Sequence, residues 1–172
     1  MTITPDLNSV PPFYKGYVEN VKSFDLHEAL RHAGQTTVAL VRTIPEPKGD
    51  FRYEPGKWTI RELLCHMMDA ERIFAYRALR FARNDTTPLS GFEENDYATE
   101  ANAEGRTIAR IADEMEHLRT TSIDLFLSFT QEMLRRTGTA NKTELSVVNL
   151  GFIIAGHELH HRKILVERYL KS

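Results

Sequence analysis

The stretch that decides the fold is residues 145–170, which read LSVVNLGFIIAGHELHHRKILVERYL. Its apolar residues recur at the three- and four-residue spacing of an α-helix. On a wheel of about 100° per residue, His157 and His161 fall in one sector with three aliphatic residues: Leu150, Ile154 and Ile164. The pattern therefore predicts a long helix whose core-facing side carries two histidines.

Three upstream segments show the same helical period. They span residues 25–44, 59–83 and 105–136. Asp25 with Glu28, and Thr59 with Glu62, have the spacing of a capping box at a helix start. Gly138 is expected to end the third segment. Four long amphipathic helices predict an all-α fold, a four-helix bundle, and no strand is expected.

The connection over residues 84–104 carries no clear period and contains Pro88 and Gly91. A link of this length between adjacent helices is unusual and is often functional. It is long enough to travel the length of a bundle, so the second and third helices are able to run parallel.

Composition predicts one domain over residues 1–172 and excludes several classes of protein. The net charge of −2, without a basic block, argues against nucleic acid as a partner. No apolar run reaches the ~18 residues that cross a bilayer, so no membrane contact is expected. Residues 1–12 are polar and do not resemble a signal peptide, and the single Cys65 cannot form an internal disulfide. A cytoplasmic location is the expectation.

The two histidines four residues apart are able to grip one metal ion from one helix face. The alternative is a pair of ordinary, partly buried histidines hydrogen-bonded to carboxylates. His157, Glu158 and His161 also match the His-Glu-x-x-His signature of zinc proteases, with Glu158 as the general base. Only eleven residues follow His161, and none of them is suited to be the further ligand. His160 lies about 60° from His157 on the wheel and is the weaker ligand candidate.

A third ligand must come from upstream. The imidazole candidates are His27, His32, His66 and His117. His66 lies at the edge of the apolar stripe of the second helix, ~10 Å along that helix, while His161 lies ~14 Å from the end of the last helix. These depths nearly coincide if the two helices are antiparallel. Three protein ligands leave a coordination position open, as in catalytic metal sites.

At these residues the chain resembles the DinB-like superfamily of metal-binding four-helix bundles, which includes YfiT-like proteins. The motifs that carry the resemblance are PGKWTIREL leading to His66, DAER at 69–72, PLSGF at 88–92 and GHELHH at 156–161. The resemblance implies an up-down-down-up bundle with a long crossover between helices two and three. It also implies a divalent metal on His66, His157 and His161, and a homodimer.

The resemblance leaves the reaction open. It implies a metal-dependent thiol S-transferase or hydrolase, with zinc or nickel as the metal, a low-molecular-weight thiol as a further cofactor and a small-molecule substrate. The alternative is a non-catalytic metal-binding stress-response protein or a ligand-binding dimeric bundle. A structural bundle without metal is the third hypothesis.

Three other features yield expectations. The last helix has a second apolar stripe, which predicts contact with residues 13–18 or, by a small margin, with a second subunit. Its residues are Val148, Phe152, Ala155, Leu159, Val166 and Leu170. Arg77, Arg80 and Arg83 are expected to form a solvated basic stripe, with an anion-binding Arg77 as the alternative.

The acidic and aromatic residues of the 84–104 connection are placed to overhang the metal, but the spacing assigns them no catalytic role. They are Glu93, Glu94, Asp96 and Tyr97.

Overall fold

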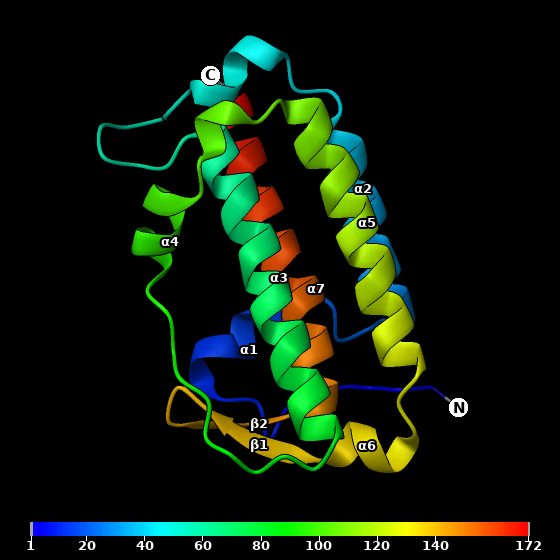
Figure 1. The fold of residues 1–172 in the computed structure, drawn as a ribbon. Helices are drawn as coiled ribbons and strands as arrows, with labels where there is room; N and C mark the ends of the chain where they lie inside the picture. The colour runs from blue at the N-terminus through cyan, green and yellow to red at the C-terminus, as the bar shows by residue number, and fades with distance from the viewer. Residues whose placement is uncertain (1, 172) are drawn as a thin grey trace.

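The structure is a computed structural model that describes residues 2–171. Four long helices pack side by side (Figure 1). They are α2 (Leu26–Val41), α3 (Ile60–Ala82), α5 (Ile108–Leu127) and α7 (Val147–Ile164), and a π-helical turn at Leu165–Leu170 extends α7. Both α3 and α2 contact both α5 and α7. The prediction of a mainly helical four-helix bundle is confirmed.

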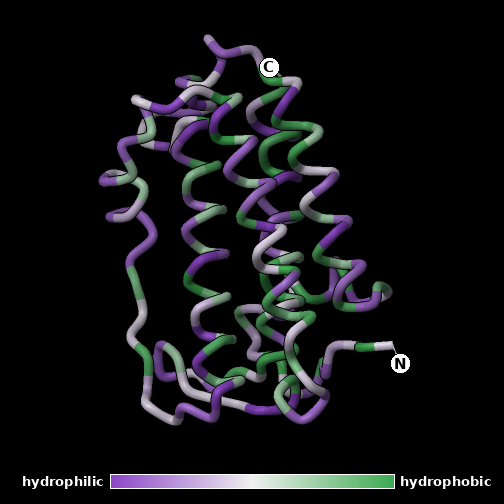
Figure 2. The backbone as a smooth tube through the Cα atoms, turned by 45° about the vertical axis from the view of Figure 1, so that its right-hand side comes forward, coloured by the Kyte–Doolittle hydropathy of each residue, from purple (hydrophilic) through white to green (hydrophobic). Residues whose placement is uncertain are grey.

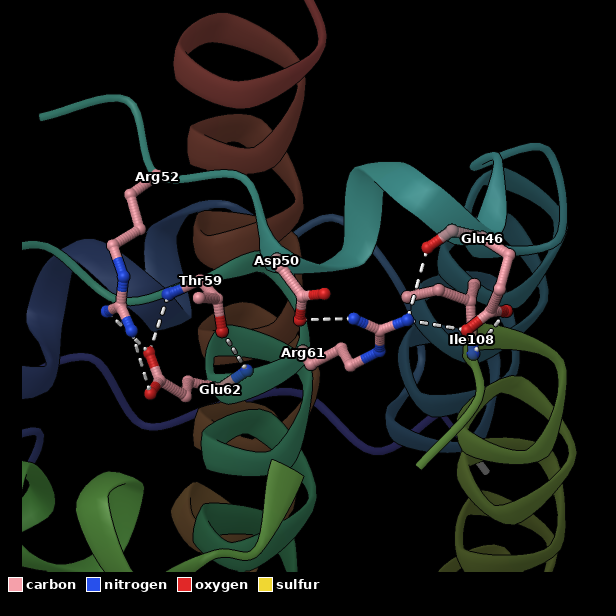
Figure 3. Close-up of polar contacts among 7 residues, drawn as sticks. All are labelled: Glu46, Asp50, Arg52, Thr59, Arg61, Glu62 and Ile108. Carbon is pink, nitrogen blue, oxygen red and sulfur yellow. Dashed lines mark hydrogen bonds and ion pairs between the residues drawn. The ribbon is translucent and has the colours of Figure 1, made fainter. Parts of the chain in front are cut away.

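The helix starts follow the capping signals of the sequence. Asp25 and Glu28 form a complete capping box at α2, and Thr59 and Glu62 form one at α3. At α3 the Thr59 backbone N–H donates to Glu62 at 2.7 Å, and Arg52 holds the same carboxylate from outside (Figure 3). These bonds satisfy amides that have no partner inside the helix.

A buried arginine joins the starts of α3 and α5. Arg61 pairs with Asp50 and Glu46 of the short 3-10 helix η1 (Glu46–Asp50), as Figure 3 shows. Glu46 also accepts the backbone N–H of Ile108, the first residue of α5, at 2.9 Å. The starts of α3 and α5 therefore lie at the same end of the bundle. The chain returns to that end through α4 (Glu94–Glu100) and the short η2 (Ala103–Gly105) (Figure 1).

The predicted third helix was too long. It ends at Leu127, and a short α6 (Gln131–Arg135) follows after a break at residues 128–130. The strands β1 (Thr137–Ala140) and β2 (Thr143–Ser146) then form an antiparallel hairpin, so the expectation of no strand was wrong. The turn between them has positive φ at two consecutive residues, which is the backbone form of a tight hairpin. The first of them, an asparagine, tolerates this form well.

The hairpin holds the crossover in place. Leu89 donates its backbone N–H to Thr139 and accepts the N–H of Asn141, both at 2.9 Å. Gly138 does not end a helix; it lies against Phe81, where a Cβ atom would come within 2.1 Å of the ring. Any side chain at position 138 would therefore push the hairpin away from α3.

The helix α1 (Pro12–Glu19) was not among the predicted helices, and it covers the second apolar stripe of α7. Val18 of α1 belongs to the same apolar cluster as Phe152 and Ala155 of α7. Residues 13–18 therefore contact this stripe, as one of the two alternatives predicted, and contact with a second subunit stays a prediction.

The core consists of two apolar clusters with a polar layer between them. Figure 2 shows hydrophobic and hydrophilic residues alternating along each long helix. Close to the boundary between the two clusters lie three buried charged residues, Glu71 of α3, Arg119 of α5 and Glu158 of α7. Among residues 2–171, no helix has the length and hydropathy needed to cross a membrane.

Candidate metal centre

Three histidines from two helices meet at the level of this polar layer. His66 Nε2 of α3 lies 3.2 Å from His157 Nε2 and 3.2 Å from His161 Nε2, both of α7. All three ligand atoms lie within 4.8 Å of one another. The structure thus brings together the three residues predicted as ligands. In the described part of the chain, no other group of three His, Cys, Asp or Glu residues converges in this way.

The spacing of the three nitrogens suits a metal ion. His66 Nε2 lies 3.2 Å from each of the other two Nε2 atoms, a separation that one ion with metal–nitrogen distances of about 2.0–2.1 Å would span. Hydrogen bonds alone would serve the three groups poorly, because one nitrogen of His66 faces two others. A cation at the centre would satisfy all three lone pairs, so the residues fit a divalent metal.

The protonation state supports the same reading. Burial lowers the pKa of His66 to about 4 and that of His161 to about 3. It also lowers the pKa of His157 well below its usual value, with smaller effects from His161 and His66. All three imidazoles are therefore neutral near pH 7, which is the form that binds metals.

Aromatic side chains fix the orientation of the imidazole rings. The Trp58 ring lies 4.7 Å from that of His66, and Tyr17 contacts His157 edge-on at 5.4 Å. Phe74 packs against the other side of the site, 6.1 Å from the His157 ring. These contacts limit rotation of the His66 and His157 rings, so the Nε2 atoms of these two residues are held in position before any ion arrives.

The remaining histidines lie outside the cluster. His160 contacts the Tyr17 ring at 5.1 Å, and His32 stacks on Phe24 at 4.9 Å. His117 is exposed on α5, as the wheel predicts. His27 lies near the start of α2 and is not part of the group.

The position of Glu158 argues against the zinc protease interpretation. Its carboxylate is buried and forms an ion pair with Arg119, which also binds Glu71 through two bonds of 2.9 Å. Burial raises the pKa of Glu158, and the charge of Arg119 opposes that effect. Glu158 is thus committed to the polar layer. Its partners Arg119 and Glu71 were not predicted, because their only signal was a charge within an otherwise apolar face.

A cavity of about 230 Å³ opens beside His66 and His157. Aromatic residues from α1, α3 and the crossover line it, and they include Tyr14, Tyr17, Phe74 and Phe92. Asn141 of the hairpin turn lines it too. Glu93 and Glu94 are among the lining residues, whereas Asp96 and Tyr97 are not. A second cavity of about 280 Å³ is lined by His161, and Glu94 lines that one too.

The three arginines of α3 differ from one another, contrary to the predicted solvated stripe. Arg77 is buried, lines the first cavity and donates to the Ser90 carbonyl oxygen at 3.1 Å. Arg80 pairs with Asp85, and Arg83 is exposed with its guanidinium carbon 5.9 Å from the Phe129 ring centroid. The expectation was wrong for Arg77 because the crossover and α1 cover that part of α3.

Cys65 is buried, and its sulfur accepts a hydrogen bond from Arg106 at 3.4 Å. Burial raises the pKa of this thiol, with Arg106 opposing the effect. Cys65 lines neither cavity. It is the only cysteine of the chain, so the protein supplies no thiol to the histidines.

Fold and site together define a class: four-helix-bundle proteins with a three-histidine cluster that suits a divalent metal. The chain belongs to the DinB superfamily, whose family model matches residues 29–165 and so includes all three histidines.

Two further comparisons agree with this assignment. A protein of Oceanobacillus iheyensis named "Putative metal-dependent hydrolase" is 26% identical over 150 residues, which are 83% of this chain and 84% of that protein. YfiT from Bacillus subtilis, described as a probable metal-dependent hydrolase with an unusual four-helix bundle topology, has a similar fold. The TM-score is 0.73 at 14% identity, over 99% of this chain and 93% of that one.

Proposed function

We propose that this protein is a metal-dependent enzyme whose divalent metal, zinc or nickel, is held by His66, His157 and His161. The observation that carries the proposal is the open side of the site. Two cavities reach the histidines, and no fourth side chain closes the cluster among the described residues. A structural metal site is typically closed by four protein ligands, whereas a catalytic site keeps a position free. The open cavities thus favour an enzyme over a non-catalytic metal-binding bundle.

The reaction we propose is hydrolysis of a small molecule. A divalent metal on three imidazoles supplies Lewis acidity and lowers the pKa of a coordinated water or thiol. The names of the Oceanobacillus protein and of YfiT support hydrolysis. Glu94 is our candidate for proton exchange because it lines both cavities. Its pKa is raised by burial and by the neighbouring Glu93, which brings it closer to neutral pH.

Transfer of a thiol is the second reaction that this site suits. The protein has no cysteine in either cavity, so the thiol would be a separate low-molecular-weight cofactor. The cavity of about 230 Å³ beside His157 has the volume for such a small molecule. The same histidines and the same open side serve both reactions, and only the nucleophile differs.

Metal analysis tests the proposed ligands. Purified wild type is expected to carry close to one metal ion per chain, and His157→Ala to carry almost none. His117→Ala is the matched control, because His117 is an exposed histidine on α5. Chelation is expected to lower the melting temperature of the wild type and of His117→Ala, since a bound metal stabilises the folded state by mass action. Equal metal content in wild type and His157→Ala would exclude the site.

Activity requires a separate experiment. Metal-loaded protein is screened against esters and amides, with and without low-molecular-weight thiols and electrophiles. We expect turnover that disappears in His66→Ala and falls at least tenfold in Glu94→Gln, while Glu94→Gln keeps its metal. Turnover that persists in His66→Ala would move the chemistry away from this site. Metal binding without turnover of any compound would favour the non-catalytic alternative.

A further inference from the structure

Three arginines of this chain are buried, and one of them lacks an anionic partner. Arg61 pairs with Asp50 and Glu46, and Arg119 pairs with two carboxylates of the polar layer. Arg77 is only 3% exposed, yet no carboxylate of residues 2–171 forms an ion pair with it. A buried charge without a counter-ion is costly, so a position that keeps one calls for an explanation.

The contacts of Arg77 leave part of its guanidinium available. One NH2 group donates to the Ser90 carbonyl oxygen, and a further side-chain hydrogen bond joins Arg77 to Tyr14. A guanidinium has five N–H donors, so these two neutral partners do not exhaust it. Burial lowers the pKa of Arg77, but an arginine remains charged at any physiological pH. Arg77 lines the cavity beside the histidines, so its remaining N–H donors belong to a residue of the cavity wall.

Two ring contacts set an upper limit on the distance between this cation and the histidines. The Arg77 guanidinium carbon lies 5.7 Å from the Phe74 ring centroid, and that centroid lies 6.1 Å from the His157 ring. Arg77 and His157 are thus within about 12 Å, the sum of those distances. The Tyr14 ring contacts Phe74 edge-on at 5.9 Å. The wall between the cation and the histidines is therefore aromatic.

We infer that Arg77 is the anchor for a carboxylate group of the substrate, whose apolar part lies along Phe74 and Tyr14 with its other end at the histidines. This inference rests on the proposed function only in placing the reacting end of the substrate at the histidines. A carboxylate fits better than a phosphate dianion, because Glu93 and Glu94 line the same cavity and repel a second negative charge. Arg77 thus selects substrates that are monoanions with an apolar body.

The test uses a pair of probes that differ in charge and hardly in size, 4-phenylbutanoate and 4-phenylbutanamide. Their binding to the metal-loaded full-length protein is measured by calorimetry. We expect the carboxylate to bind wild type at least tenfold more tightly than the amide. Arg77→Met is expected to remove that preference, and Arg77→Lys to retain part of it, because lysine keeps the charge without the forked geometry. Arg83→Met, which removes an exposed arginine of the same helix region, is expected to bind like wild type.

Two further variants separate this inference from the metal proposal. Since carboxylates also bind metals, the probes are measured on His66→Ala and on chelated wild type. Preference for the carboxylate that survives in both, and is lost in Arg77→Met, supports the anchor even if the metal proposal fails. Preference that is lost with the metal and kept in Arg77→Met overturns the anchor. Equal binding of both probes to wild type, or binding of neither, overturns the inference without any variant. The inference can therefore be tested even if Arg77→Met misfolds.

Discussion

Replacing Gly156 by alanine sets two physical effects against each other at one position of α7. Gly156 lies directly before His157, where α1 crosses α7. A Cβ atom at this position would lie 2.0 Å from the backbone carbonyl oxygen of Tyr17. Ordinary van der Waals contact begins at 3.4 Å, so α1 would have to move by about 1.4 Å. Because the obstacle is backbone, no side-chain rotation relieves the clash.

The two effects have different magnitudes. Alanine is favoured over glycine in a helix interior by about 1 kcal/mol, which stabilises the variant. Overpacking a well-filled site costs typically about 1–3 kcal/mol and occasionally more, and this contact is shorter than real Cβ contacts ever are. We therefore place the cost at or above the upper end of that range. The net expectation is a loss of about 2 kcal/mol in the free energy of unfolding, or roughly 4–8 °C in melting temperature.

Gly16→Ala is the matched control, because Gly16 is a helical glycine of α1 with nothing within 4 Å of its Cβ position. There only the helix propensity acts, and the melting temperature is expected to rise by roughly 2–4 °C. Both variants are compared with wild type by calorimetry and by urea unfolding. Equal stabilisation of Gly156→Ala and Gly16→Ala would refute the close packing of α1 on α7, and with it the wall that Tyr17 gives the cavity.

Three further predictions concern stability. Arg119→Met is expected to cost about 3–5 kcal/mol in urea unfolding, because it leaves Glu71 and Glu158 buried without a counter-ion; a loss below 1 kcal/mol would contradict that arrangement. Thr59→Ala removes the hydroxyl that caps α3 and is expected to cost about 1 kcal/mol in urea unfolding; an unchanged free energy of unfolding would contradict that role. In metal-free protein the pKa of His66 falls from 6.5 to about 4 on folding because of burial, so between pH 6.5 and 4 the unfolded chain binds a proton that the folded protein does not, and the folded state is destabilised as the pH falls through that range. The expected decrease from His66 is about 3 kcal/mol, and a pH titration of unfolding in which His66→Leu declines as steeply as wild type would disprove it.

The parts of the fold that sequence predicts are those with a local signal. Helical periodicity and capping boxes gave α2, α3 and α7, since both depend on residues within a few positions of each other. The three candidate metal ligands could also be predicted from the sequence, because His157 and His161 share a helix face and His66 lies on the apolar stripe of a second helix. The predicted depths of His66 and His161 agree with their contact at 3.2 Å.

The parts that sequence misses depend on contacts between distant segments. The segment 128–136 has the apolar residues of a helix, but Phe129 and Leu134 are buried through a break and a short α6 instead. The hairpin depends on a turn at Asn141 and Lys142 that carries no glycine, so the usual signal was absent. Burial of Arg77 depends on the crossover and α1, neither of which its helical wheel contains.

The candidate metal ligands and part of the cavity wall come from different segments of the chain. The three histidines and the polar layer belong to the long helices, within the segment 29–165 that the DinB superfamily model matches. Tyr14 and Tyr17, which form one wall of the cavity, belong to α1 and lie outside that segment. Tyr17 contacts the His157 ring and also lines the cavity, so a change there would affect both, whereas Tyr14 contacts Phe74. Under the proposed function, the long helices would hold the metal, while α1, the crossover and α3 would line the cavity through which molecules reach it.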